Sequence, residues 1–120
     1  MPYDMDYVFV YGTLRQGGSN HHLLRNAQLM GLARTTEFYA LYRDVIPYVV
    51  QGREISPILG EVYQVDQETF EQLDLLEGHP DWYVRERKVV RLESGEELGA
   101  WIYFFPQPKG ELVPSGDFFS

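Results

Sequence analysis

The order of apolar and polar residues along the chain predicts a strand-rich domain. Five segments rich in aromatic and β-branched residues are expected to form strands: residues 6–11, 34–42, 58–65, 83–92 and 97–105. Ser94-Gly95 lies between the last two and indicates a hairpin. Residues 44–52 are expected to be an irregular loop, because they contain Pro47 and Gly52, and the tail from Pro106 is expected to be extended.

Two segments predict short helices beside these strands. Ser19 or Asn20 can cap a helix that runs to about residue 27 and turns three apolar side chains inward: Leu23, Leu24 and Ala27. Asp66 caps a second helix, expected at about 67–77 and ended by Gly78 and Pro80. Five or six mostly antiparallel strands with two helices define an α+β domain with a strongly curved or closed sheet.

The second helix carries the most informative carboxylate. Phe70, Leu73 and Leu76 recur at helical spacing, and Glu77 follows Phe70 by seven residues, so it points with the apolar stripe. Partial burial and the negative end of the helix dipole both raise the pKa of a carboxyl group placed there. The alternative is that Glu77 turns out to solvent, as is expected of Glu71 and Asp74.

A second alternative for Glu77 is an ion pair. Arg85 follows a tight Gly-His-Pro turn and could pair with Glu77. Such a pair would lower the pKa of the carboxyl group and would argue against a role as a general base.

The end of the first strand predicts a second feature of a binding site. Val8–Tyr11 runs directly into Gly12, Thr13 and Leu14, and then into Gly17-Gly18. Glycine lets another group approach the backbone closely, and N–H groups at a strand end can bind an anion or a carbonyl oxygen. The simpler interpretation is a strand followed by a plain turn.

Composition limits the possible functions. A chain of 120 residues, 44% hydrophobic, fits one domain, 1–120, with one core. The absence of cysteine excludes disulfides, thiolate nucleophiles and cysteine zinc sites. Ten basic residues against 18 acidic ones, without a basic cluster, argue against binding to nucleic acid. No apolar run is long enough to span a membrane, and the acidic start does not resemble a signal peptide, so a cytoplasmic location is expected.

Several other candidate motifs carry less weight. His21-His22 lacks metal-ligand spacing and is expected to be a solvated first helical turn, while His79 is expected in a loop near the site. Thr13 is a candidate nucleophile without a paired base, so substrate binding is the better interpretation. The chain has no nucleophile elbow, Walker A motif or dinucleotide-binding glycine fingerprint.

Two segments resemble motifs of the γ-glutamylcyclotransferase family, especially its small γ-glutamylamine cyclotransferase-like members. Val10-Tyr11-Gly12-Thr13-Leu14 is similar to the family's YG[S/T]L loop, and residues 73–80 with Tyr83 and Arg85 resemble its EGxPxxYxR segment. Weaker similarities occur at Asn20 and at residues 60–65, 100–103 and 114–117. The resemblance spans nearly the whole chain.

The resemblance implies a small mixed barrel with flanking helices and an enzyme that needs no metal or cofactor. Its implied substrate is a γ-glutamyl amine or related amide, whose α-amino group attacks the γ-carbonyl to give 5-oxoproline and a free amine. Glu77 takes the place of the family's acid/base glutamate. Five residues are assigned to substrate binding: Tyr11, Gly12, Thr13, Leu14 and Tyr83. Tyr48 after Pro47 departs from the small residue of many relatives and leaves the substrate open.

Intramolecular attack also suits what this sequence contains. Positioning supplies much of the rate, and the reaction needs one acid/base group and donors for the oxyanion. Two alternatives remain: a non-catalytic binder of a small carboxylate, and a structural protein whose motif residues only hold the barrel together. The leaving amine and the oligomeric state are not determined by the sequence.

Overall fold

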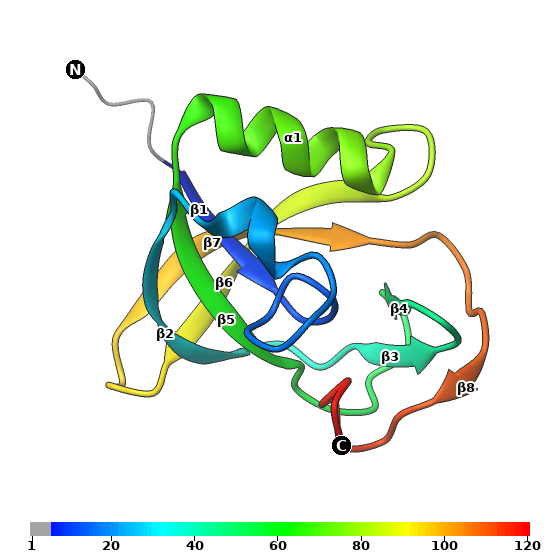
Figure 1. The fold of residues 1–120 in the computed structure, drawn as a ribbon. Helices are drawn as coiled ribbons and strands as arrows, with labels where there is room; N and C mark the ends of the chain where they lie inside the picture. Colours follow the sequence, from blue (N-terminus) through cyan, green and yellow to red (C-terminus); the bar gives the residue numbers. More distant parts are fainter. Residues whose placement is uncertain (1–5) are drawn as a thin grey trace.

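A closed barrel of five strands forms the main body of the protein in the computed structural model, which describes residues 6–120 (Figure 1). The strands are β1 (Asp6–Val10), β2 (Gln28–Thr35), β5 (Leu59–Val65), β6 (Val84–Leu92) and β7 (Glu97–Phe104). Their order is β1-β5-β2-β6-β7, and the β1–β7 pair that closes the barrel is parallel while the other pairs are antiparallel. The predicted α+β class with a mixed, mostly antiparallel barrel is confirmed. The acidic start, residues 1–5, lies outside the described residues.

A second, smaller sheet packs beside the barrel and corrects two predictions. It consists of β4 (Pro47–Val50), β3 (Ala40–Arg43) and β8 (Glu111–Leu112), in the order β4-β3-β8. The single strand expected at 34–42 is wrong, because it combines the end of β2 with β3. The intervening bend carries the half-exposed Phe38, and strand propensity does not reveal where a chain leaves one sheet for another.

The loop expected at 44–52 is also wrong in its centre. All four residues of β4 are buried, and β4 pairs antiparallel with β3. Pro47 is the first residue of this edge strand, a place where a missing N–H is tolerated. The tail beyond Pro106 is tied down by β8, which pairs with β3.

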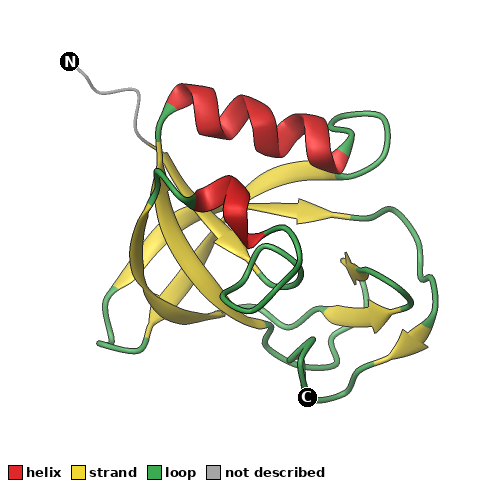
Figure 2. Cartoon of the chain, in the orientation of Figure 1, coloured by secondary structure: helices red, strands yellow, loops and turns green. Residues whose placement is uncertain are grey.

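The helix α1 (Gln67–Glu77) has the predicted limits, and it runs along one side of the barrel (Figure 2). Asp66 Oδ1 accepts a hydrogen bond from the Thr69 N–H at 2.8 Å, and Gly78 ends the helix with a left-handed φ of 65°. The other predicted helix is only a 3₁₀ turn, η1 (His21–Leu24). The Asn20 side chain does not cap it but donates to Thr13 Oγ1 at 3.0 Å. No helix within residues 6–120 is long and apolar enough to cross a membrane.

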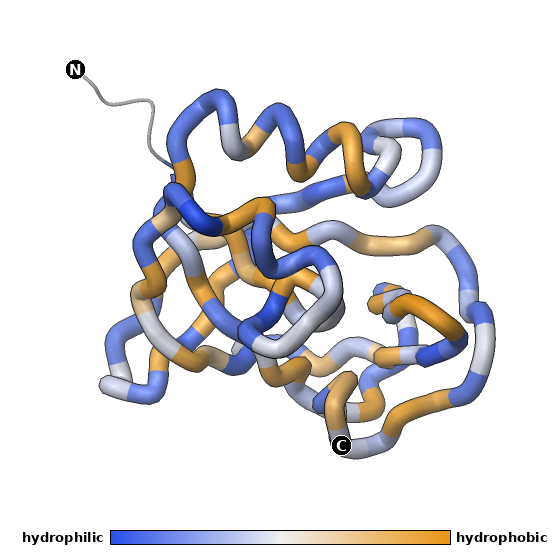
Figure 3. Tube along the Cα trace, in the orientation of Figure 1, coloured by the Kyte–Doolittle hydropathy of each residue, from blue (hydrophilic) through white to orange (hydrophobic). Residues whose placement is uncertain are grey.

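Alternate residues along β1 and the adjoining Tyr11 belong to two hydrophobic clusters. Val8 and Val10 pack with the buried face of α1, whereas Phe9 and Tyr11 pack in the second cluster. Figure 3 shows hydrophobic stretches, coloured orange, within the strands of the barrel. A strand buried on both faces explains the continuous apolar run at residues 8–11. The glycine loop that follows β1 and the end of α1 line the same cavity.

Candidate active site

A small cavity lies where the loop after β1 meets the carboxyl end of α1. Its volume is about 80 Å³, well below the roughly 300–1,000 Å³ of pockets that enclose drug-sized ligands. Residues from six stretches of the chain line it: Phe9, Val10, Tyr11, Gly12, Thr13, Leu14, Asn20, Ile46, Pro47, Leu76, Glu77, Trp82, Tyr83 and Tyr103. Leu76 and Trp82 are 39% and 54% exposed, so they mark its opening. A ligand larger than a small acyl group would extend past them.

Glu77 is the single carboxyl group among these lining residues. Its side chain is partly buried, and it makes no hydrogen bond or ion pair with any residue from 6 to 120. Burial raises the pKa of Glu77 to about 7, because no positive charge or donor from residues 6–120 compensates the lost hydration of the carboxylate. The helical spacing therefore gave the correct side: Glu77 faces the cavity.

Arg85 does not pair with Glu77 but with Asp74. Its Nε donates to Asp74 Oδ1 at 2.8 Å, and its Nη2 donates to Oδ2 at 3.2 Å. The expectation that Asp74 points to solvent is wrong, since this carboxylate is partly buried and also accepts from the Tyr103 hydroxyl at 2.7 Å. Spacing on one helix could not reveal partners that come from β6 and β7.

The loop after β1 is held by contacts on both sides. The Tyr11 hydroxyl donates to the Tyr103 carbonyl at 2.6 Å, and burial, followed by the nearby Glu77, raises the pKa of Tyr11. Arg15 N–H donates back to the Gly12 carbonyl at 2.9 Å, which forms a turn. The N–H groups of Thr13 and Leu14, both in lining residues, donate to no acceptor within the described part of the chain. They are available to a ligand oxygen.

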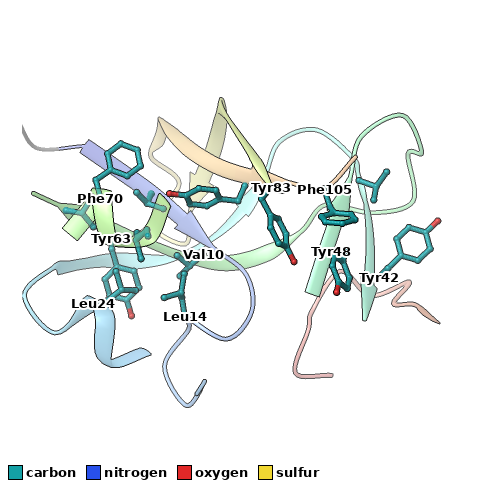
Figure 4. Packing of buried hydrophobic residues seen from close by; sticks show 14 of the residues in the cluster. Val10, Leu14, Leu24, Tyr42, Tyr48, Tyr63, Phe70, Tyr83 and Phe105 are labelled. Atoms are coloured by element: carbon teal, nitrogen blue, oxygen red, sulfur yellow. The ribbon is translucent and has the colours of Figure 1, made fainter. Parts of the chain in front are cut away.

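Gly12 is packed closely against Pro47. A Cβ added at Gly12 would overlap the Pro47 ring, and no positive φ requires glycine there. The Tyr83 hydroxyl donates to the Pro47 carbonyl at 2.7 Å and so fixes the start of β4. Tyr83 also lies with Tyr48 and Phe105 in an aromatic group (Figure 4), with Tyr48 and Tyr83 stacked at 5.9 Å between ring centroids. The close approach expected at Gly12 is therefore made by another part of this chain.

The cavity brings together all six residues named from the sequence: Tyr11, Gly12, Thr13, Leu14, Glu77 and Tyr83. His79 is not among the lining residues; its Nδ1 accepts from the Arg85 N–H at 3.3 Å. His21 is not simply solvated, because its Nδ1–H donates to the Leu14 carbonyl at 3.0 Å. Sequence reasoning missed Ile46, Trp82 and Tyr103 as lining residues, and no local pattern distinguishes them from ordinary loop or strand residues.

Glu77 should make the stability of the protein depend on pH. The pKa of a glutamate is about 4.3 in an unfolded chain and about 7 at this site when folded. The contribution of Glu77 to the free energy of unfolding should therefore fall as the pH rises from about 4 to 7 and stay low above that. We expect Glu77→Gln to match the wild type at pH 4 and to be more stable by up to about 3 kcal/mol at pH 8. Urea denaturation at both pH values measures this, and an equal difference at both would contradict it.

The fold and the cavity together define a class of protein: a small mixed barrel with one carboxyl group facing a glycine loop across a pocket. The family model described as gamma-glutamyl cyclotransferase, AIG2-like, matches residues 8–120. A protein from Methanocaldococcus jannaschii, provisionally named a gamma-glutamylcyclotransferase, is 51% identical over 115 residues, which cover 95% of this chain and 96% of that protein. A zebrafish (Danio rerio) gamma-glutamylaminecyclotransferase is 39% identical over 72% of this chain and 62% of its own length.

Solved structures agree with these sequence matches. A crystal structure of a Pyrococcus horikoshii protein has a TM-score of 0.74 and 33% identity, covering 94% of this chain and 89% of that chain. A mouse AIG2-like protein has a TM-score of 0.78 and 29% identity, covering 85% and 78%. The chain belongs to the AIG2-like gamma-glutamyl cyclotransferase family, and it is an enzyme of the gamma-glutamylcyclotransferase type.

Proposed function

We propose that this protein converts a γ-glutamyl amine, or a related γ-glutamyl amide, to 5-oxoproline and the free amine, with Glu77 as the general acid and base. The observation that carries the proposal is the position of Glu77, unpaired and facing the Tyr11–Leu14 loop across the cavity, with a pKa near 7. A carboxyl group with that pKa can both accept and return a proton at neutral pH.

The reaction is a ring closure within one substrate. The α-amino nitrogen attacks the γ-carbonyl carbon, a C–N bond forms in a five-membered ring, and the bond from that carbon to the amine nitrogen breaks. Two protons move from the attacking nitrogen to the leaving nitrogen, and none is taken from solvent overall. In this scheme Glu77 takes a proton from the substrate's ammonium group and delivers it to the departing nitrogen. No second substrate is needed, so positioning supplies much of the rate.

The loop supplies the groups that hold the substrate in this scheme. The unpaired N–H groups of Thr13 and Leu14 are donors of the kind that bind a carboxylate or stabilise an oxyanion. Tyr11 and Tyr83 shape the cavity and stay uncharged. Burial, and to a smaller extent the charge of Glu77, raises the pKa of both hydroxyls above the ordinary tyrosine value. The amine portion of the substrate would leave through the opening at Leu76 and Trp82.

A panel of γ-glutamyl amines and γ-glutamyl peptides tests the proposal. We expect 5-oxoproline and the free amine to appear in equal amounts with at least one member of the panel. Binding of γ-glutamyl compounds, measured by calorimetry, without any release of 5-oxoproline would favour the non-catalytic binder instead. The absence of both binding and turnover across the panel would contradict the proposed substrate class.

A further inference from the structure

A cluster beside the cavity consists of Asp74, Arg85 and Tyr103, which come from α1, β6 and β7. Arg85 makes two hydrogen bonds to the two oxygens of Asp74, at 2.8 and 3.2 Å, and the Tyr103 hydroxyl donates to Oδ1 at 2.7 Å. The side chains of Arg85 and Asp74 are only 22% and 23% exposed. This geometry of a guanidinium and a carboxylate is specific and strong compared with an exposed ion pair.

Aromatic rings hold the Arg85 guanidinium in place. Its central carbon lies 4.2 Å from the centroid of the Phe70 ring and 4.5 Å from that of the Trp101 ring. Cation–π attraction and the paired carboxylate therefore fix a positive charge at the side of α1. The charge is balanced only by Asp74, since no other salt bridge of Arg85 occurs within residues 6–120.

Glu77 lies three residues after Asp74 on the same helix, and residues at that spacing are neighbours on a helix surface. Tyr103 links the two, because it lines the cavity with Glu77 while its hydroxyl is engaged by Asp74. The other titratable lining residues are Tyr11 and Tyr83, whose hydroxyls donate to backbone carbonyls. His79, beyond Gly78, accepts from the Arg85 N–H and lies edge-on to Tyr103.

We propose that Asp74 is a positioning residue that occupies Arg85 and the Tyr103 hydroxyl and thereby leaves Glu77 unpaired and free to move protons. The inference rests on the proposed role of Glu77. Without the Asp74 carboxylate, the Arg85 guanidinium would lose its balancing charge, and the Tyr103 hydroxyl, on a residue that lines the cavity with Glu77, would be free. Both favour the ionised carboxylate and weaken it as a base. Without Arg85, the unbalanced charge of Asp74 would act on Glu77 in the opposite direction.

Three variants separate this role from a merely structural one. Asp74→Asn keeps the size of the side chain and removes its charge, so we expect the pKa of Glu77 to fall by about one unit or more. Arg85→Met leaves the charge of Asp74 without a balancing cation, so we expect the pKa of Glu77 to rise. The double variant removes both charges, and we expect the Glu77 pKa to return to within about half a unit of the wild-type value. Loss of packing alone would not produce shifts of opposite sign that cancel.

The pKa of Glu77 is measured by titrating the ¹³C signal of its side-chain carboxyl carbon, assigned by comparison with Glu77→Gln. This readout does not require turnover, so it remains informative if no substrate of the panel reacts. Glu71→Gln is the matched control, because it removes an exposed carboxylate six residues before Glu77 on α1 and should leave the Glu77 titration unchanged.

The pH dependence of kcat/KM tests whether the pKa of Glu77 controls the reaction. The acid limb of kcat/KM should move with the Glu77 pKa, to lower pH in Asp74→Asn and to higher pH in Arg85→Met. Three results would overturn the inference: an unchanged Glu77 titration in folded Asp74→Asn, shifts of the same sign in both single variants, or an equal shift in Glu71→Gln. Shifts of the Glu77 titration without any turnover by the wild type would support the inference and contradict the proposed function instead.

Discussion

Replacing Glu77 with glutamine should lower the rate of 5-oxoproline release by about 10²–10⁴, the range usual for loss of general acid–base catalysis. Glutamine has nearly the same size, so the cavity should keep its shape and substrate binding should persist. The amide cannot accept the substrate's ammonium proton or return it to the leaving nitrogen. The loss should therefore appear in kcat and leave the dissociation constant of a γ-glutamyl ligand within a few-fold of the wild type.

Glu71→Gln provides the matched control for this experiment, because Glu71 is an exposed glutamate on the same helix. It should retain wild-type kcat. Turnover by folded Glu77→Gln within about fivefold of the wild type would remove Glu77 from the mechanism, since even modest acid–base catalysis exceeds that factor.

Gly12→Val should damage both stability and activity. The added Cβ would overlap the rigid ring of Pro47, so the loop or the start of β4 must move. Overpacking of this kind costs about 1–3 kcal/mol of unfolding free energy. The same displacement would misalign the Thr13 and Leu14 N–H groups relative to Glu77. A misplacement of about 1 Å can cost about 100-fold in rate, so we expect a loss of that order in kcat/KM.

Gly99→Val tests whether any added side chain would have this effect. Gly99 lies in β7, and the nearest atoms to an added Cβ belong to the flexible end of the Arg87 side chain. It should retain activity and lose less stability than Gly12→Val in urea denaturation. Wild-type activity and stability in Gly12→Val would show that Pro47 can move without consequence and that the loop is not held by this contact.

Local signals were sufficient for those parts of the fold that depend on one segment. The limits of α1 follow from Asp66 and Gly78, which satisfy the backbone groups at the two helix ends. The β6–β7 hairpin follows from Ser94-Gly95. The inward direction of Glu77 follows from its spacing from Phe70 and Leu73, both of which are buried.

Long-range contacts decided the rest. The break between β2 and β3 depends on a change from one sheet to another, and the burial of β4 depends on its contacts with β3 and with Tyr83. Asp74 is the clearest case, because its partners lie 11 and 29 residues away in the sequence. The helical periodicity predicted that Asp74 points to solvent. On that side of α1, however, Arg85 packs against the rings of Phe70 and Trp101 and pairs with Asp74.

The same contacts explain the electrostatics of the cavity. Sequence reasoning left open an ion pair between Arg85 and Glu77, which would have lowered the pKa of the glutamate. Arg85 pairs with Asp74 and not with Glu77. Burial is therefore the main influence on the pKa of Glu77 and raises it to about 7. A carboxyl group that titrates near neutral pH is the property on which the proposed mechanism depends.

The pH dependence of kcat/KM for the wild type tests that property most directly. With a γ-glutamyl amine that the enzyme turns over, we predict that kcat/KM rises through an acid limb with an apparent pKa near 7, and that this limb is absent from the residual rate of Glu77→Gln. A limb at pH 4–5, typical of an exposed carboxyl group, or an identical limb in Glu77→Gln, would contradict the account of Glu77 as a buried, unpaired acid/base group.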